Sequence, residues 1–372
     1  MIIDLHNPTV VVFGRGRLAE LGHHTRSYGG NALLVCGRTA MRAHGVLDAA
    51  MSACASAGVR VTVFDDVSAD PLASEVDAAA EAARVSGCDV VIGLGGGSAI
   101  DAAKATAVGL RHGPAGPLVG TTVDSRADAV PVVAVPTTGG SGAEVTKGAI
   151  ITDGERRLKS GIRGDDLFPR VAIIDPDLLR TVPAATAAAA GFDALAHAVE
   201  GYVARKSNAV TRVLAEQALD LLRGRLPRIA TGALDDGARE DLALAALLGG
   251  LNVANASSCL PHRLQQAMGS VPGVRISHGN GLASVYPAWL DRAVPHAEDR
   301  FAVIAELLGG DDPGTAIGGL IAAAGAGGSL TSRGFTRADI DLLVRGVTGN
   351  TGNDPIPGVD DDLVRSIYED SL

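Results

Sequence analysis

The first half of the chain alternates short apolar, often β-branched runs with segments in which apolar residues recur at helical spacing. Most of these runs are continuous, which is typical of strands covered on both faces of a parallel sheet. We therefore predict strands over residues 9–13, 32–36, 59–64, 89–94, 132–135, 149–152 and 171–175. Helices are predicted between them over residues 17–21, 40–57, 72–85 and 98–110. This order predicts an open, Rossmann-like parallel sheet that binds a nucleotide.

The second half has a different pattern, because the β-branched runs stop near residue 180. From there nearly every segment is rich in alanine and leucine at helical spacing. Helices are predicted over residues 184–204, 210–222, 239–254, 281–293, 301–308, 313–324, 337–347 and 361–370. The sequence therefore predicts two domains, an α/β dinucleotide-binding domain over residues 1–180 and an all-α domain over residues 181–372.

Composition narrows the class of protein. A formal net charge of -10 argues against non-specific binding to nucleic acids or anionic membranes. No uncharged apolar run reaches the roughly 18 residues needed to span a bilayer, and the N-terminus lacks the pattern of a secretion signal. The 4 cysteines are widely spaced and form no C-x-x-C motif, which is typical of reduced core residues. We expect a cytoplasmic protein with no nucleic-acid or membrane partner.

Two glycine clusters follow predicted strands. Residues 93–98 read Gly-Leu-Gly-Gly-Gly-Ser and open the helix predicted after strand 89–94. Glycines here let the backbone approach a pyrophosphate, and the helix N-terminus supplies free N–H groups, although such a turn can also be purely structural. The second cluster lies within residues 136–144, where hydroxyls and backbone amides can line a cofactor or substrate. Both clusters are candidate parts of a dinucleotide site.

The candidate metal chemistry begins with Asp193 and His197. They are four residues apart, so on a helix the carboxylate and the imidazole project from one face. A surface hydrogen bond is the alternative interpretation of this pair taken alone. Three histidines remain downstream, and His262 and His278 each lie beside a helix boundary marked by glycine or proline. One carboxylate with three imidazoles would complete a ligand set for iron or zinc.

Five motifs taken together resemble the iron-containing alcohol dehydrogenase family. They are residues 95–98 with Asp101 and Lys104, then residues 136–146, 171–176, 191–200 and 277–279. They occur in the family's order and cover nearly the whole chain. The resemblance implies an α/β dinucleotide-binding domain followed by an all-helical metal domain, with the active site in the cleft between them. This architecture is similar to that of dehydroquinate synthase.

The resemblance also implies a role for each matched residue. The metal ligands would be Asp193, His197, His262 and His278, and these four together with Lys159 would be the catalytic residues. The metal would be Fe(II), with Zn(II) or another divalent ion possible. The residues implied at the pyrophosphate are Gly95, Gly96, Gly97 and Ser98, and those at the nicotinamide and substrate end are Thr137, Thr138 and Lys159. We also expect Asp101 and Ser141, in the same motifs, to bind the cofactor. For Lys159 a solvated cation is the alternative.

The activity implied is that of an oxidoreductase acting on CH–OH groups. A hydride would pass between the nicotinamide and a small aldehyde or alcohol, while the metal stabilises charge on the substrate oxygen as a Lewis acid. The segment over residues 277–289 resembles the butanol-dehydrogenase-like branch, which favours aldehyde reduction.

Two departures from the family pattern bear on this reaction. Many members carry a second histidine four residues after the ligand matched by His262, but this chain has Gln266, which cannot titrate. Many NAD-using members carry an aspartate after the strand matched by residues 32–36, but here Gly37 and Arg38 follow it. Without that carboxylate a 2'-phosphate is not repelled, and Arg38 can pair with it. The sequence therefore favours NADP(H) over NAD(H).

The substrate is less defined. Arg163, Arg263 and Arg275 lie near the segments of the expected cleft, and one pointing inward would indicate an acidic substrate such as phosphonoacetaldehyde or maleylacetate. The alternative for each arginine is a solvated surface position. Two other function classes stay open. One is a metal- and NAD-dependent lyase of the dehydroquinate-synthase type, and the other is a non-catalytic binding relative, made conceivable by Gln266. We expect a homodimer, for which the predicted edge strand over residues 9–13 offers a pairing surface.

Overall fold

A computed structural model describes residues 3–232 and 234–372. The chain forms two compact units, which we describe separately. The α/β unit consists of Asn7–Thr138 and Ala143–Thr181. The helical unit consists of Gly139–Gly142, the described residues of Val182–Leu372 and those up to His6.

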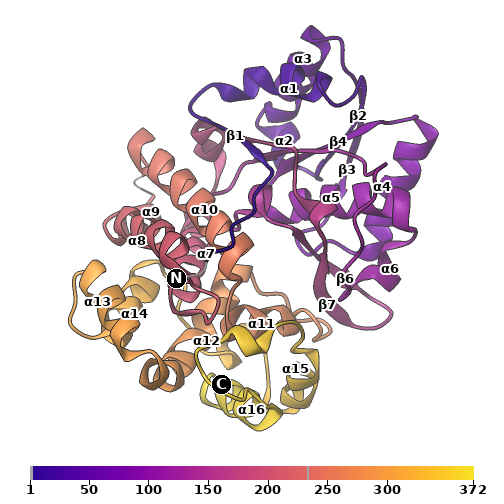
Figure 1. Ribbon diagram of the computed structural model, residues 1–372. Coiled ribbons are helices and arrows are strands. Elements are labelled where there is room, and N and C mark those ends of the chain that lie inside the picture. The colour runs from indigo at the N-terminus through magenta and orange to yellow at the C-terminus, as the bar shows by residue number, and fades with distance from the viewer. Residues whose placement is uncertain (1–2, 233) are drawn as a thin grey trace. The chain divides into compact units, whose positions relative to one another are not determined.

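The α/β unit is built on a six-stranded sheet in the order β1-β8-β5-β4-β2-β3 (Figure 1). All neighbouring strands in it run parallel, as predicted. The strands are β1 (Val10–Phe13), β2 (Asn31–Gly37), β3 (Arg60–Val67), β4 (Val90–Gly95), β5 (Val132–Pro136) and β8 (Val171–Ile174). In the register of the sheet Leu94 lies beside both Cys36 and Val135. The carboxyl ends of β2, β4 and β5 are therefore neighbours.

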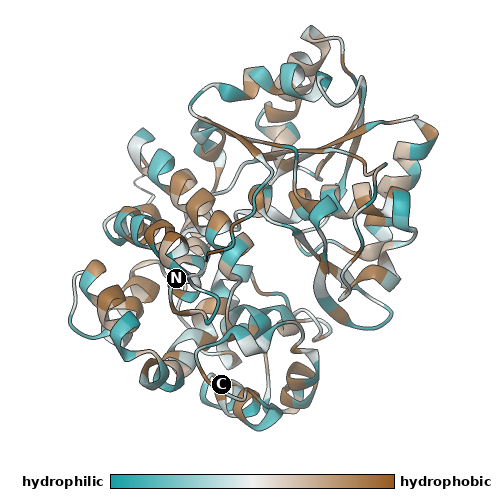
Figure 2. Cartoon of the chain, in the orientation of Figure 1, coloured by the Kyte–Doolittle hydropathy of each residue, from teal (hydrophilic) through white to brown (hydrophobic). Residues whose placement is uncertain are grey.

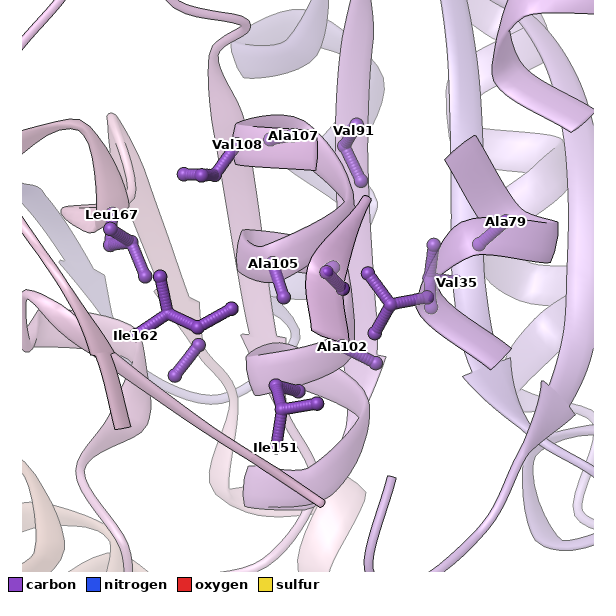
Figure 3. Packing of buried hydrophobic residues seen from close by; sticks show 14 of the residues in the cluster. Val35, Ala79, Val91, Ala102, Ala105, Ala107, Val108, Ile151, Ile162 and Leu167 are labelled. Carbon is purple, nitrogen blue, oxygen red and sulfur yellow. The ribbon is translucent and has the colours of Figure 1, made fainter. Parts of the chain in front are cut away.

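Strands β4, β5 and β8 are apolar and buried along their whole length because helices cover both faces of the sheet. Leu34 and Ile92 face a cluster that includes residues of α1 (Leu21–Arg26), α2 (Ala40–Ala43) and α3 (Val46–Ser56). Val35 and Val91 face the opposite cluster, with residues of α4 (Ala73–Val85) and α5 (Gly97–His112) (Figure 3). Figure 2 colours these strands mainly as hydrophobic. Each fully buried Val, Leu or Ile contributes roughly 1.5–3 kcal/mol relative to an exposed one.

Two parts of the α/β unit differ from the predicted elements. The strand predicted over residues 149–152 is present as β6 (Gly148–Asp153), but it pairs antiparallel with β7 (Leu158–Arg163) in a separate hairpin. In this hairpin Asp153 Oδ1 accepts the turn amides of Glu155 and Arg156, at 3.0 and 3.1 Å. The helix predicted over residues 40–57 is broken at Gly45, whose φ of 71° lies in the left-handed region. The shorter elements are η1 (Arg17–Glu20), α6 (Ala115–Leu118), η2 (Ala143–Val145), η3 (Asp165–Leu167) and η4 (Pro176–Thr181).

The helical unit contains no strand among its described residues, as the prediction of an all-α second half requires. Its longer helices are α7 (Ala184–Val203), α8 (Ala209–Arg223), α10 (Asp236–Ala256), α12 (His278–Ala293), α13 (Glu298–Leu307), α14 (Pro313–Ala323) and α16 (Asp361–Asp370). The shorter elements are α9 (Leu226–Ala230), α11 (Leu260–Met268), α15 (Ile340–Gly346), η5 (Val294–His296), η6 (Thr331–Arg333), η7 (Arg337–Asp339) and η8 (Thr351–Asn353). Helix α11 was not predicted, and α12 begins at His278 instead of residue 281.

The segment Gly139–Gly142 packs against α7 and α10. A Cβ on Gly140 would lie 2.7 Å from the carbonyl oxygen of Ala190 in α7. A Cβ on Gly142, where φ is +60°, would lie 2.4 Å from Cα of Gly250 in α10. Glycine is therefore required at these positions by close packing of backbones, a reason that the sequence pattern did not show.

Two further features bear on the expectations drawn from composition. All 4 cysteines are free. Within residues 3–232 and 234–372 no single helix is long and apolar enough to cross a membrane, and only the pair α10 and α11, bent by 103°, passes that test together.

Candidate functional site

Helix α7 carries three polar residues on one buried face. Asp193, His197 and Glu200 follow one another at intervals of four and three residues, so their side chains lie along one side of the helix. The alanines around them favour the helix and leave room for neighbouring helices to approach. Asp193 is 4% exposed, His197 5% and Glu200 0%. Polar groups buried this deeply need polar partners, which two other helices supply.

Helices α11 and α12 bring His262 and His278 to Asp193. Helix α11 begins after Cys259 with Pro261 in its first turn, a favoured position for proline, and His262 follows it directly. His278 is the first residue of α12. The Nε2 atoms of His262 and His278 lie 3.3 and 3.4 Å from Asp193 Oδ1. Two imidazoles from different helices therefore face one carboxylate oxygen.

His197 completes the cluster. Its Nε2 lies 3.7 Å from the same Asp193 oxygen, and its ring stacks on that of His262 with centroids 4.4 Å apart. The ligand atoms of Asp193, His262 and His278 all lie within 4.8 Å of one another, while His197 stands slightly apart from that group. All four residues predicted as metal ligands thus lie together in the helical unit.

Charge and burial act against each other in this cluster. Burial raises the pKa of the Asp193 carboxyl, but His197, His278 and His262 outweigh it and hold this pKa well below its usual range. Burial lowers the pKa of His197 to about 4. Burial also lowers the pKa of His262, but the charges of Glu200 and Asp193 and their hydrogen bonds raise it to about 9. The carboxylates of Glu200 and Asp193 thus stabilise positive charge at His262.

The donor set of this cluster fits a divalent transition metal. One carboxylate oxygen and imidazole nitrogens are ligands that iron and zinc accept. The three Nε2 atoms converge on Asp193 Oδ1, and among the described residues the Nδ1 atom of buried His197 has no hydrogen-bond partner. The cluster is therefore incompletely satisfied by protein groups alone, as expected where a cation is to be bound.

The first glycine cluster forms the turn from β4 into α5. Gly95 has φ +149°, and a Cβ on it would lie 2.8 Å from the Cβ of Ala99. Gly96 precedes the helix, and a Cβ there would lie 3.1 Å from Thr138 Oγ1. The amide of Thr137 donates to the carbonyl of Gly95 at 2.9 Å, which joins this turn to the end of β5. The structure thus brings the turn at 95–98 together with Thr137 and Thr138.

The comparisons with known proteins agree with this arrangement. The family model described as iron-containing alcohol dehydrogenase matches residues 8–176, and the model of that family's C-terminal part matches residues 187–372. The chain belongs to the iron-containing alcohol dehydrogenase family. It is therefore an oxidoreductase that acts on CH–OH groups with a nicotinamide dinucleotide.

Individual relatives support the same family. The chain is 33% identical over 303 residues to a NAD-dependent methanol dehydrogenase of Bacillus methanolicus, covering 81% of this chain and 79% of that protein. An NADH-dependent butanol dehydrogenase A of Thermotoga maritima has a similar structure, with TM-score 0.89, 27% identity and coverage of 99% and 98%. So has a sulfoacetaldehyde reductase of Bifidobacterium kashiwanohense in complex with NAD+, with TM-score 0.86, 28% identity and coverage of 99% and 98%. Among the alternatives drawn from sequence, these findings support the dehydrogenase.

In this alcohol dehydrogenase Asp101 and Lys104 have partners inside the α/β unit. Asp101 Oδ2 accepts the amide of Ile150 at 3.0 Å, and Oδ1 lies 3.3 Å from the Lys104 ammonium. Lys104 is fully buried and donates to the carbonyls of Ala143 and Thr146, at 2.9 and 3.2 Å. These contacts tie α5 to β6 and to the segment after Gly142, so they give Asp101 a structural role beside the predicted cofactor contact.

Arg38, at the end of β2, is engaged by two carboxylates. Its Nε lies 2.5 Å from Asp66 Oδ1 and its Nη2 lies 3.0 Å from Glu75 Oε1. Asp66 lies near the end of the neighbouring strand β3. A carboxylate is therefore present at this edge of the sheet, although the sequence indicated none after β2. This pairing weakens the argument that Arg38 is available for a 2'-phosphate.

Lys159 and Ser141 lie in different surroundings from those expected. Lys159, in β7, is 6% exposed and its ammonium pairs with Asp70 Oδ1 at 2.6 Å, so it is not a solvated cation. It belongs to the α/β unit, whereas the predicted metal ligands belong to the helical unit. Ser141 lies in the segment Gly139–Gly142, which belongs to the helical unit. Ser98, which was predicted at the pyrophosphate, uses its Oγ to donate to the carbonyl of Ala69.

Gln266, which departs from the usual family pattern, lies one turn after His262 on α11. It is 5% exposed, and its Oε1 accepts from Arg263 Nη1 at 3.4 Å. Arg263 is buried as well, so for this arginine the solvated alternative is wrong. Arg275 is exposed and Arg163 is half-buried. Among the three arginines considered for an acidic substrate, Arg263 is thus the one beside a candidate ligand.

Proposed function

We propose that this alcohol dehydrogenase interconverts a small alcohol and its aldehyde at a metal held by Asp193, His197, His262 and His278. The observation that carries the proposal is the convergence of three imidazole Nε2 atoms on one oxygen of buried Asp193. When bound, iron or zinc supplies Lewis-acid stabilisation of charge on the substrate oxygen, and the nicotinamide supplies or accepts the hydride.

The protein's own side chains prepare this site. Asp193 contributes negative charge in a place from which water is largely excluded, which strengthens its attraction for a cation. The imidazoles contribute neutral nitrogen donors at fixed positions. The side chain of His278 is 36% exposed, whereas those of His197 and His262 are 7% and 5% exposed. We infer that the substrate approaches the cluster from the side of His278.

The turn between β4 and α5 is our proposed pyrophosphate site. The first amides of an α-helix have no partner within the helix, and the helix N-terminus attracts an anion. Gly95, Gly96, Gly97 and Ser98 lie at this terminus. Thr137 and Thr138, joined to that turn, are proposed to line the nicotinamide end. Lys159 keeps a proposed role near the substrate, which Lys159→Met would test by a rise in KM.

The choice of dinucleotide is a finer proposal. Sequence alone favours NADP(H), but in the structure a 2'-phosphate would compete with Asp66 and Glu75 for Arg38. We therefore propose NAD(H), with Asp66 opposing a 2'-phosphate through like-charge repulsion. The ratio of kcat/KM for NADH and NADPH tests this proposal. We expect NADH to be preferred and Asp66→Asn to narrow the difference, whereas a preference for NADPH in the unmodified enzyme would contradict it.

The substrate proposal follows from the relatives and from Arg263. The named relatives act on methanol, butanol and sulfoacetaldehyde. Arg263 is buried directly after His262, which supports a substrate with an acidic group such as phosphonoacetaldehyde or maleylacetate. A panel of neutral and acidic aldehydes separates these classes. If Arg263 binds the acidic group of the substrate, Arg263→Met should raise KM for acidic aldehydes and leave it unchanged for neutral ones.

The decisive experiment is anaerobic reconstitution with Fe(II), and separately Zn(II), followed by 340 nm absorbance of NADH and NADPH with the aldehyde panel. We expect metal-dependent oxidation of the reduced dinucleotide. A protein that binds neither metal nor dinucleotide would end the proposal. Oxidation independent of added and bound metal would contradict the role given to Asp193 and the histidines.

Two proposals concern the state of the protein in the cell. The edge strand β1 carries exposed valines, Val10 at 52% and Val11 at 37%, which supports our expectation of a homodimer. Light scattering after size-exclusion chromatography would give the mass directly. The free cysteines support the expectation of a reducing, cytoplasmic location.

A further inference from the structure

Glu200 is a fully buried carboxylate that is not among the proposed metal ligands. It lies three residues after His197 on the same face of α7, and its exposed fraction is 0%. A buried carboxylate is costly unless its oxygens accept hydrogen bonds. Glu200 Oε1 lies 2.7 Å from His262 Nδ1, and Glu200 Oε2 accepts the backbone amide of Cys259 at 2.7 Å. Both oxygens are therefore engaged by the helix that carries His262.

The contact with Nδ1 fixes the chemistry of the other ring nitrogen. Because a carboxylate only accepts, Nδ1 must carry the proton that it shares with Glu200. In the neutral ring the lone pair then lies on Nε2, which faces Asp193 Oδ1 at 3.3 Å. Glu200 thus selects the tautomer in which His262 can donate to a cation beside Asp193.

The contact with Cys259 fixes the position of the ring. Cys259 is the N-cap of α11, and His262 lies three residues further along. A carboxylate at a helix N-terminus is stabilised by the free amides and the helix dipole. Glu200 therefore holds both the imidazole and the start of the helix that presents it, from the helix that carries Asp193 and His197.

The other buried imidazole lacks such a partner. Among the described residues, His197 Nδ1 has no hydrogen-bond partner. Of these two buried imidazoles, His262 is therefore the one whose Nδ1 contacts a carboxylate in the part of the chain that the structure describes. We propose that Glu200 is a positioning residue for His262 and that it sets the affinity of this ligand for the metal. This inference rests on the proposed function, since it assumes that His262 is a ligand.

Asp354 provides a matched control. It is also 0% exposed, and its Oδ2 accepts the amide of Leu260, next to Cys259, at 2.8 Å. Its other acceptor contacts are with Trp289 Nε1 at 3.1 Å and the amide of Ile356 at 3.0 Å. Asp354 thus stabilises the same end of α11 without touching any of the four proposed ligands. A purely structural role for Glu200 would make Glu200→Gln and Asp354→Asn behave alike.

The test is the dissociation constant for Co(II) and Zn(II), measured by competition with a chelator, together with the melting temperature of the metal-free protein. In Glu200→Gln the amide cannot accept both N–H groups, and we expect the metal to bind about 10–100-fold more weakly. In Asp354→Asn we expect a lower melting temperature with metal affinity within about threefold of the unmodified protein. We also expect the Co(II) absorption bands to shift only in Glu200→Gln.

Each contrary outcome is distinguishable. If the unmodified protein binds metal but Glu200→Gln binds it equally tightly, the inference is overturned while the proposed function stands. Equal weakening in Asp354→Asn would reduce Glu200 to a structural residue. If the unmodified protein binds no metal, this inference and the proposed function are both contradicted.

Should Glu200→Gln fail to fold, the unmodified Zn(II)-loaded protein still decides the question by NMR. A slowly exchanging Nδ1 proton of His262, assigned by its loss in His262→Ala, is expected, and its absence would contradict the inference.

Discussion

Each unit contains a buried cluster of charged side chains, and the two clusters obtain their positive charge differently. In the α/β unit Lys104 is fully buried and pairs with Asp101, near the buried carboxyl of Glu144. In the helical unit the side chains that pair with Asp193 and Glu200 are imidazoles, and Glu200 also accepts the backbone amide of Cys259. The first cluster contains its own cation, the Lys104 ammonium. In the second cluster, positive charge has to come from a proton on an imidazole or from a bound cation. A buried cluster of the second kind is the stronger indication of a binding site.

The largest expected effect is on the cluster that lacks its own cation. His262→Ala removes one nitrogen donor and the partner of Glu200, so metal binding and turnover should both fall. Lewis-acid stabilisation is worth several kcal/mol, and we expect a loss of turnover on the order of a thousandfold. The measurements are metal content and initial rates at 340 nm. His296→Ala is the control, because this exposed histidine lies outside the cluster. Equal losses in both variants would contradict the comparison.

The next effect concerns the cluster that contains its cation. Lys104→Met removes the ammonium that pairs with Asp101 and lies near the carboxyl of Glu144. Breaking a buried pair in this way destabilises a protein by about 3–5 kcal/mol. Urea unfolding would measure the loss. Arg111, on the same helix as Lys104, forms an exposed pair with Asp128 and is the control; Arg111→Met should cost at most about 1 kcal/mol. If Lys104→Met costs no more than this control, the cluster is not a structural ion pair.

A smaller effect is expected from pH. Burial raises the pKa of Glu144 from 4.5 to about 7. Between these values the unfolded chain releases this proton while the folded protein keeps it, so stability should fall as pH rises and level off above about 7. The loss amounts to about 3 kcal/mol at most, reduced in practice by Lys104 and Asp101. Unfolding curves at pH 5 to 8 for the unmodified protein and Glu144→Gln would test this. In Glu144→Gln the unfolding free energy should no longer fall over this pH range. An unchanged fall in the variant would show that other groups cause it.

The smallest effect concerns the packing of α7, the helix that carries Asp193 and His197. Gly140 packs against Ala190, three residues before Asp193, and a side chain there would overpack the contact. We expect Gly140→Ala to cost about 1–3 kcal/mol in unfolding free energy. Gly109→Ala, where a Cβ would meet nothing within 4 Å, is the control and should be neutral or slightly stabilising. Equal unfolding free energies of the two variants would show that the close contact at Gly140 does not affect stability.

The sequence predicts the parallel sheet and the helical second half because continuous apolar runs and helical periodicity are local signals. It also predicts the pair Asp193 and His197, whose spacing is fixed by one helix. Helix α11 is missed, although Pro261 just inside its start is a usable signal. Strand β7 is missed because it carries Lys159 and Arg163, and only the Asp153–Gly154 turn before it indicates a hairpin.

Other features depend on contacts between distant segments and have no local signal. The pairing of Arg38 with Asp66 and Glu75, which are 28 and 37 residues away along the chain, requires the three-dimensional structure. So does the reason for glycine at Gly140. The role of Glu200 has a local signal only in part. Its place on the same helix face as Asp193 and His197 follows from the spacing, but its contact with His262 does not.

The chain enters the helical unit as Gly139–Gly142 and leaves it again before the final passage at Val182. A protease cut between residues 181 and 182 would leave the whole α/β unit in the N-terminal fragment, together with the segment Gly139–Gly142 of the helical unit. The C-terminal fragment would lack the glycines that pack against Ala190 and Gly250, and would expose that surface to solvent. Expressed alone, the C-terminal fragment should therefore be less soluble than the N-terminal fragment, and mixing the two fragments should restore its solubility. For the same reason, gene fusion at one junction is an unfavourable way to exchange the helical unit among such enzymes.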